Sequence, residues 1–376
     1  MRHNYLLLLF SICLGLFWAC SDDEDGEYIE VSPVVVDLSQ VPYEKLSDYK
    51  FFVGDMKELK PALGVLPYEP VSSLFSDYAH KKRFVWMPSG TKATFNGDGN
   101  ALEFPVGAVL IKNFYYEDVQ NVTPVGAARI IETRLMIRKQ DGWMFADYVW
   151  NAEQTEAYYD IAGSYTEISW KDGNNQVKST SYRIPTLAQC IVCHKKRVET
   201  NGGEETVYVP IGPKPQNLNF NYQYESGSQN QLQKWMAVGY LENGPLPLAS
   251  SSAIDYSDAS QPLELRVRSY ADANCAHCHS DMRHCDYRPM RFAFADTGGE
   301  NGRTNLGVCV DTQDMQGFPS ELNKIVNPGR PMQSMLHYRI NTTNEAYRMP
   351  LHGRTVIHEE GVQLFTDWIN SLPECQ

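Results

Sequence analysis

The chain has 376 residues, of which 43% are hydrophobic, and its 33 Lys and Arg against 46 Asp and Glu give a net charge of −13 at pH 7. This length predicts two or three compact domains rather than one small fold. Such a negative charge argues against nucleic acid as a partner and is compatible with a basic protein partner.

Residues 1–19 have the pattern of an export signal. A short basic start precedes an apolar run from Leu6 to Phe17, which is too short to cross a bilayer as a mature helix. The run ends in Leu-Phe-Trp-Ala-Cys, which resembles a lipobox, so cleavage before Cys20 would leave that thiol to carry a lipid anchor. The alternative is an ordinary secretory signal followed by an incidental cysteine.

Residues 20–61 are predicted to be an acidic tether and lead-in. An acidic run, Asp22 to Glu27, is typical of a solvated segment. Directly after a lipidated cysteine it also resembles the export tag that carries some Gram-negative lipoproteins to the outer face of the outer membrane. We therefore expect an outer-membrane lipoprotein that faces the periplasm or the cell surface.

Residues 62–185 contain the strongest strand signals. The segment Arg134–Ile137 alternates polar and apolar side chains, turns at residues 140–142 and returns through Trp143 to Trp150. A second hairpin pairs residues 165–170 with 176–183, and a further strand is predicted over residues 104–116. The pattern predicts an antiparallel β sandwich or barrel.

The pentapeptide Cys-x-x-Cys-His occurs twice, 85 residues apart. It is the attachment site of c-type haem, in which both thiols add across haem vinyl groups and the histidine binds the iron. A zinc or redox site is the alternative, but neither requires histidine after the second cysteine both times. The motifs predict two covalently bound haem c groups, with attachment at Cys190, Cys193, Cys275 and Cys278 and proximal iron ligands His194 and His279.

The second half of the chain is predicted to be helical and loop-rich. Residues 186–242 form the first haem-binding segment with a helix over 229–240, and residues 243–262 form a Pro-, Ser- and Ala-rich linker. In residues 263–376 a helix over 263–273 runs into the second motif, and an amphipathic helix over 359–372 ends the chain. This order resembles a class I cytochrome c domain, so the whole chain is expected to be a multidomain α+β protein.

For the second haem, Met349 is the expected sixth ligand, because it lies before Pro350 and the last helix, where cytochrome c domains have an axial methionine. Met332, Met335 and His337 are its competitors, and three further histidines are expected at the surface: His277, His352 and His358. For the first haem the distal ligand is undecided, and the iron could also lack one. The candidate ligands are Met236, which core packing also explains, Met87, Met144 and His80.

Three further cysteines remain in an oxidising compartment, which are Cys285, Cys309 and Cys375. Cys285 and Cys309 share one irregular, Gly-rich insert, so we expect a disulfide between them. Cys375 would then be free or would compete for one of the two.

Together these features resemble a family of dihaem c-type cytochromes with a strand-rich N-terminal region. Besides the two motifs, the resemblance rests on stretches that include Leu66-Pro67-Tyr68, residues 74–79 and 82–85, Phe104-Pro105-Val106-Gly107, residues 131–135, and Tyr148-Val149-Trp150-Asn151. The resemblance implies haem binding and electron transfer with redox protein partners, without a defined substrate or assigned catalytic residues.

A second similarity concerns the first half alone. The strand pattern of Pro105, Gly107, Val109 and Lys112, followed by the first motif, resembles cytochrome P460-type proteins, whose haem is five-coordinate and enzymatic. The leading hypothesis is therefore an electron-transfer lipoprotein. The alternatives are a haem oxidoreductase, peroxidase-like or P460-like, with an open first haem fed by the second, or a carbohydrate- or protein-binding β domain with a cytochrome attached.

Overall fold

The computed structural model describes residues 31–375, and the chain from Val34 onward forms one compact unit. The predicted signal peptide, Cys20 and the acidic run lie outside the described residues. Across residues 31–375 we find no helix with the length and apolarity that a membrane crossing requires.

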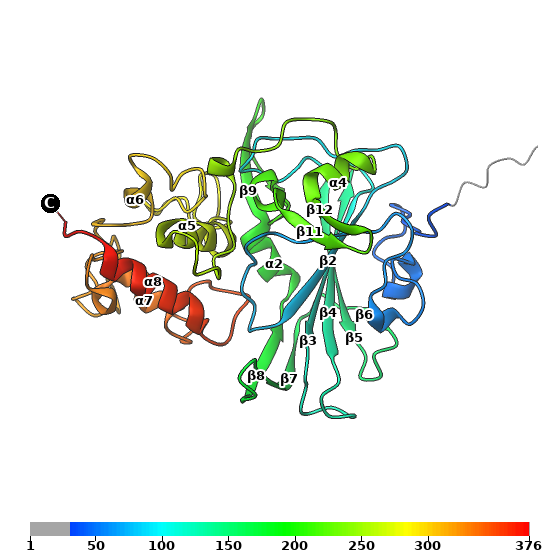
Figure 1. The fold of residues 1–376 in the computed structure, drawn as a ribbon, viewed down its shortest axis with the longest axis horizontal. Coiled ribbons are helices and arrows are strands. Elements are labelled where there is room, and N and C mark those ends of the chain that lie inside the picture. Colours follow the sequence, from blue (N-terminus) through cyan, green and yellow to red (C-terminus); the bar gives the residue numbers. More distant parts are fainter. Residues whose placement is uncertain (1–30, 376) are drawn as a thin grey trace, which may run out of the picture. The chain divides into compact units, whose positions relative to one another are not determined.

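The N-terminal half is built on a six-stranded antiparallel sheet whose strands follow one another in chain order (Figure 1). A separate two-stranded hairpin follows it. The strands are β1 (Leu66–Tyr68), β2 (His80–Trp86), β3 (Val109–Tyr116), β4 (Arg129–Lys139), β5 (Gly142–Trp150), β6 (Ala157–Tyr159), β7 (Ser164–Lys171) and β8 (Val177–Ile184). Both predicted hairpins, β4–β5 and β7–β8, are confirmed. Strand β3 begins five residues later than predicted, because Gly107 turns the backbone at φ +90°.

Both faces of the sheet are covered, which explains why its strands are apolar on two sides. Val109 and Ile111 of β3 pack against the lead-in, whose short 3-10 helices η1 (Leu46–Tyr49) and η2 (Met56–Glu58) lie over that face. The intervening Leu110 points to the other face. There it packs in one cluster with Trp235.

The remaining elements are short, and the C-terminal half is mixed helix and loop. They are α2 (Leu187–His194), β9 (Lys195–Thr200), β10 (Gly203–Tyr208), α3 (Pro215–Leu218), β11 (Asn221–Tyr224), β12 (Gly227–Asn230), α4 (Gln231–Ala237), η3 (Ala249–Ser251), α5 (Leu263–Asn274), α6 (Gly302–Asn305), η4 (Pro331–Gln333), α7 (Met335–Ile340) and α8 (Glu359–Ser371). Helix α4 is shorter than predicted, because residues 227–230 pair as a strand and Asn230 caps the helix.

Helices α5 and α8 are confirmed to within one residue at either end, and they lie side by side (Figure 1). Val267 and Ala271 of α5 pack with Phe365 and Trp368 of α8, all of them buried. Tyr270, near the end of α5, contacts His358 just before α8, so the second Cys-x-x-Cys-His motif lies close to the start of α8.

The predicted Cys285–Cys309 disulfide is wrong. The structure instead joins Cys309 to Cys375 and leaves Cys285 as a buried free thiol. The backbone N–H of Cys285 donates to the carbonyl of Cys278, which holds Cys285 in the turn after the second motif. The observed bond joins residues 66 apart in sequence, a loop whose closure stabilises the fold by about 4 kcal/mol in the chain-entropy model.

A buried ion pair fixes the middle of the sheet. The Glu132 side chain is fully buried and accepts hydrogen bonds from Arg134 Nε at 3.0 Å and from the Tyr182 hydroxyl at 2.6 Å. Burial alone would raise the pKa of Glu132, but the Arg134 charge and its hydrogen bonds hold that pKa below the usual value. Glu132 is therefore ionised and paired at neutral pH.

Replacing Glu132 with glutamine should lower the free energy of unfolding by about 3 kcal/mol, because Arg134 loses the fully buried carboxylate that accepts its hydrogen bonds. Urea unfolding followed by circular dichroism measures the loss. The matched control is Glu264→Gln, which removes the exposed partner of the exposed Arg303 and should cost less than about 1 kcal/mol. Equal losses in the two variants would contradict this account of the sheet.

Candidate functional site

The two Cys-x-x-Cys-His motifs meet in space. The Sγ atoms of Cys193 and Cys278 and a ring nitrogen of His277 all lie within 4.8 Å of one another. One sulfur comes from each motif, so segments 85 residues apart in sequence are direct neighbours in the fold. The four motif cysteines are free thiols.

The first motif occupies the end of helix α2. The Thr186 side chain and Gln189 form a capping box that starts the helix. Cys190 and Cys193 are three residues apart and therefore lie on the same helical face. His194 is the last helical residue, and the chain then enters β9. The short helix thus presents both thiols and the imidazole together.

The His194 ring is oriented by the backbone. Its Nδ1 lies 2.8 Å from the carbonyl oxygen of Val209, to which it donates its hydrogen, and its centroid lies 5.0 Å from that of the Phe145 ring. This tautomer leaves the lone pair of Nε2 for a metal, the arrangement usual for metal-binding histidines. Burial lowers the pKa of His194 to about 4, so the ring is neutral and able to ligate at pH 7.

The second motif continues directly from helix α5. The N–H of Cys275 donates to the carbonyl of Ala271, and the N–H of His279 donates to that of Cys275. His279 is buried, and burial lowers its pKa to about 4. Its Nδ1 is buried and has no hydrogen-bond partner within the described part of the chain. A buried ring nitrogen of this kind is costly unless a further group satisfies it.

Each motif opens into its own cavity. The second-motif cavity has a volume of about 270 Å³, and Cys275, Cys278 and His279 line it together with three methionines, Met290, Met335 and Met349. Two competitors of Met349 lie elsewhere. Met332 is 73% exposed, and the buried His337 bonds Thr366. Met290 is a thioether that the sequence reasoning missed.

The first-motif cavity has a volume of about 170 Å³ and lies between α2 and the sheet. Cys190, Cys193 and His194 line it, opposite side chains from β3, β4 and β5 that include Lys112, Arg134, Met136 and Asp147. None of the four distal candidates from the sequence borders it. Met87, Met144 and Met236 pack in the hydrophobic clusters, and His80 is exposed.

Titratable groups line the wall of the first-motif cavity. Both carboxylate oxygens of Asp147 are buried without a hydrogen bond, and burial together with the Glu132 charge raises the pKa of Asp147 well above its usual value. Asp147 Oδ2 also lies 3.7 Å from Arg134 Nε. Burial and the neighbouring Arg83 and Arg134 charges hold the pKa of Lys112 well below its usual value.

The two cavities share one wall, made by Phe75, Cys193, His277, Pro350 and His352. His277 is only 7% exposed, and its Nδ1 has no hydrogen-bond partner among residues 31–375. The expectation that His277 lies at the surface is therefore wrong, because the first motif packs against it. His352 is partly exposed.

His358 is also buried, contrary to the sequence-based expectation. Its ring stacks on Phe75 at 4.2 Å between centroids, and its Nδ1 lies 2.9 Å from the Tyr270 hydroxyl. The N–H of Phe75 in turn donates to the side chain of Asn274, next to the second motif. Phe75, which stacks on His358, comes from the N-terminal half of the chain, so no local sequence pattern could reveal this contact.

The residues present fit the group that the motifs predict. Each cavity receives two free thiols and a neutral imidazole from a single motif, which is the donor set for one covalently attached haem. A metal ion at Cys193, His277 and Cys278 would instead mix the two motifs and leave His194 and His279 without a role.

Comparison with known proteins found no matching family model, curated protein or solved structure.

Proposed function

We propose that this chain is a dihaem c-type cytochrome lipoprotein that transfers electrons in the periplasm or at the outer membrane. The observation that carries the proposal is the pair of adjoining cavities, each containing one complete Cys-x-x-Cys-His set. When bound, haem supplies a one-electron redox centre at its iron. The sulfurs of Cys193 and Cys278 lie within 4.8 Å of each other, so the two groups would be attached at neighbouring positions. This supports electron exchange between the two centres.

The chain's own residues have separate roles in this proposal. Cys190, Cys193, Cys275 and Cys278 would attach the two groups, and His194 and His279 would bind the irons. Met349 would be a further ligand of the second iron, where its soft sulfur would favour the ferrous state and raise the reduction potential. Met349 belongs to a loop of the second-motif cavity.

We further infer the finer architecture from the packing around each motif. Helices α5 and α8 pack across a shared apolar cluster, and this supports a class I cytochrome c-like domain over residues 263–376. The covered faces of the antiparallel sheet support a sandwich- or barrel-like domain over residues 62–185. Residues 186–242 carry the first motif, and residues 243–262 link the two parts.

The surroundings of the protein follow from the sequence. Lipid on Cys20 would anchor the chain to the outer membrane, and the acidic run, Asp22 to Glu27, would separate the anchor from the domains. With a net charge of −13, the surface favours a basic redox protein as donor or acceptor.

One observation favours a haem enzyme as the second candidate. The first-motif cavity is bordered by Asp147, whose pKa burial raises, and by Lys112, whose pKa burial lowers, and Met136 is the only methionine lining it among the described residues. An open coordination site beside such groups would suit reduction of peroxide or oxidation of a small substrate, with electrons arriving from the second centre.

Electron paramagnetic resonance of the oxidised, haem-loaded, signal-free protein distinguishes the two candidates. Two low-spin signals of equal intensity would support the electron carrier, because both irons would then be six-coordinate. A stoichiometric high-spin signal beside one low-spin signal would assign an open first site and favour the oxidoreductase. A preparation without haem would contradict both.

A further inference from the structure

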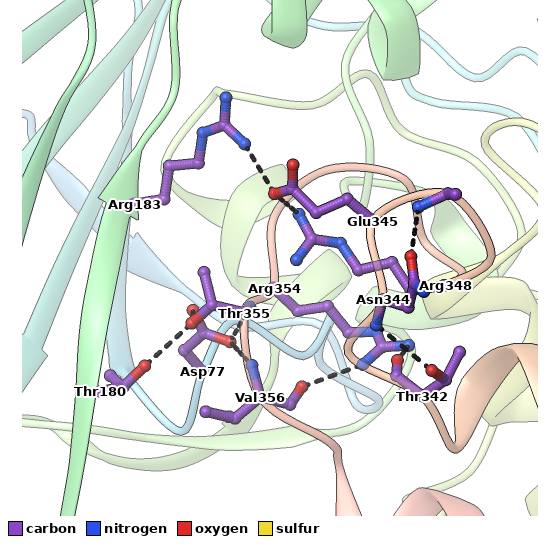
Figure 2. A network of polar contacts seen from close by, with 11 residues as sticks. Asp77, Thr180, Arg183, Thr342, Asn344, Glu345, Arg348, Arg354, Thr355 and Val356 are labelled. Atoms are coloured by element: carbon purple, nitrogen blue, oxygen red, sulfur yellow. Dashed lines mark hydrogen bonds and ion pairs between the residues drawn. The ribbon is translucent and has the colours of Figure 1, made fainter.

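We propose that Asp77 and Arg354 are positioning residues that hold Met349 in the wall of the second-motif cavity. The inference rests on the proposed function, because Met349 acts there as an iron ligand. It adds that the sheet-bearing half of the chain sets the position of this ligand. Figure 2 shows the part of the polar network around Asp77, Thr355 and Arg354.

Arg354 is buried beside the Met349 loop and forms hydrogen bonds with the backbone on both sides of it. Its side chain lines the second-motif cavity, the residue is only 4% exposed, and its guanidinium donates to four backbone carbonyls. The acceptors and distances are Met349 at 3.0 Å, Val356 at 3.1 Å, Arg339 at 3.1 Å and Thr342 at 2.9 Å. The N–H of Met349 also donates to the Arg339 carbonyl at 2.8 Å. One planar side chain therefore joins the end of α7 to both sides of the loop.

A lysine could not reproduce this arrangement. Its ammonium is a single point with three donors, whereas the guanidinium directs five N–H groups in a fixed plane. Across residues 31–375, Arg354 forms no ion pair with a carboxylate, so its whole polar role is to satisfy loop carbonyls. A buried arginine whose hydrogen bonds all go to backbone carbonyls fixes the conformation of the Met349 loop.

Asp77, in the N-terminal half of the chain, forms hydrogen bonds with the same loop. Its carboxylate accepts hydrogen bonds from the Thr355 N–H at 2.6 Å, the Thr355 hydroxyl at 2.8 Å and the Val356 N–H at 3.1 Å. The Thr355 hydroxyl also lies 2.8 Å from that of Thr180 on β8, so two sites of the N-terminal half converge on one residue of the loop (Figure 2).

Asp77 is itself held firmly. Its carbonyl accepts from the buried Tyr116 hydroxyl at 2.6 Å, which ties it to β3. Asp77 and Tyr78 both have a left-handed backbone, with φ of 49° and 64°. Such residues cost on the order of 1–3 kcal/mol each and persist where the surroundings fix them, often at functional sites. The strain places the Asp77 carboxylate opposite the Met349 loop.

The test measures displacement of Met349 by added imidazole in the haem-loaded mature protein. Arg354→Lys and Asp77→Asn should each raise the apparent affinity for imidazole at the second iron by about tenfold, the size expected for losing a charged buried hydrogen bond. The absorption near the red edge that reports a Met–iron bond should weaken in parallel. Thr355→Val, which loses only a hydroxyl, is a milder variant should either of the first two fail to fold.

Glu345→Gln is the matched control. Glu345 joins Arg183 of β8 to Arg348 and so crosses the same boundary, but it is 70% exposed and should leave the affinity unchanged. The inference alone is overturned by the following result: Met349→Ala binds imidazole more tightly than the unmodified protein, but none of the three positioning variants does. Those variants are Arg354→Lys, Asp77→Asn and Thr355→Val. If Met349→Ala also binds it unchanged, Met349 is not the ligand, and its role in the proposed function fails as well.

Discussion

Replacing both Cys190 and Cys193 with alanine should leave a mature protein with one covalently attached haem in place of two. The reason is that these two cysteines supply both thioether bonds of the first motif, and without them His194 alone would hold a haem only reversibly. Absorbance of the unfolded, acid-washed chain, expressed per polypeptide, measures the change. Replacing both Cys275 and Cys278 with alanine should have the same effect at the second motif.

Cys285→Ala is the matched control for both cysteine variants. Cys285 is buried and also lines the second-motif cavity, but it lies outside the pentapeptide. Its replacement should leave both haems covalently attached. Retention of two haems in the double variant Cys190→Ala/Cys193→Ala, or loss of one in Cys285→Ala, would contradict the assignment of the attachment sites.

Replacing Met349 with alanine should abolish the red-edge Met–iron absorption and lower one of the two reduction potentials. The expected decrease is on the order of 100 mV, a fraction of the span of about 0.8 V over which axial ligands tune haem iron. Loss of the sulfur removes the preference for the ferrous state, while the other centre keeps its own ligands. A spectroelectrochemical titration that follows both haems measures the shift.

Met335→Leu and Met290→Leu are the controls for this prediction, because both methionines line the same cavity. Met335 is only 7% exposed at the start of α7, and Met290 packs in the neighbouring cluster, so each leucine should keep the band and both potentials. Loss of the absorption in Met335→Leu with retention in Met349→Ala would transfer the ligand role to Met335.

The features that could be predicted from the sequence are local ones. The hairpins β4–β5 and β7–β8 follow from alternation and turn residues, and helices α5 and α8 follow from apolar spacing. The two attachment motifs are contiguous pentapeptides, so they are also visible in the sequence. Met349 was singled out by its position before Pro350, and it does line the cavity.

The features that could not be predicted depend on contacts between distant segments. The Cys309–Cys375 bond depends on where α8 ends relative to the insert, which spacing alone does not give. His277 is buried because the first motif packs on it, and the network of Asp77 and Arg354 joins residues almost 280 positions apart. Alternation along β4 places Arg134 and Met136 on one face of the sheet, which the sequence already indicates. That this face lines the first-motif cavity depends on the packing of α2 against the sheet, which the sequence does not indicate.

Mass spectrometry of peptides from the mature, purified protein tests the central claim most directly. The account predicts that peptides containing residues 190–194 and 275–279 each carry the mass of one haem, joined through both cysteines, and that no other peptide does. Unmodified cysteines in both peptides, from protein expressed with a haem-attachment system outside the cytoplasm, would contradict the account.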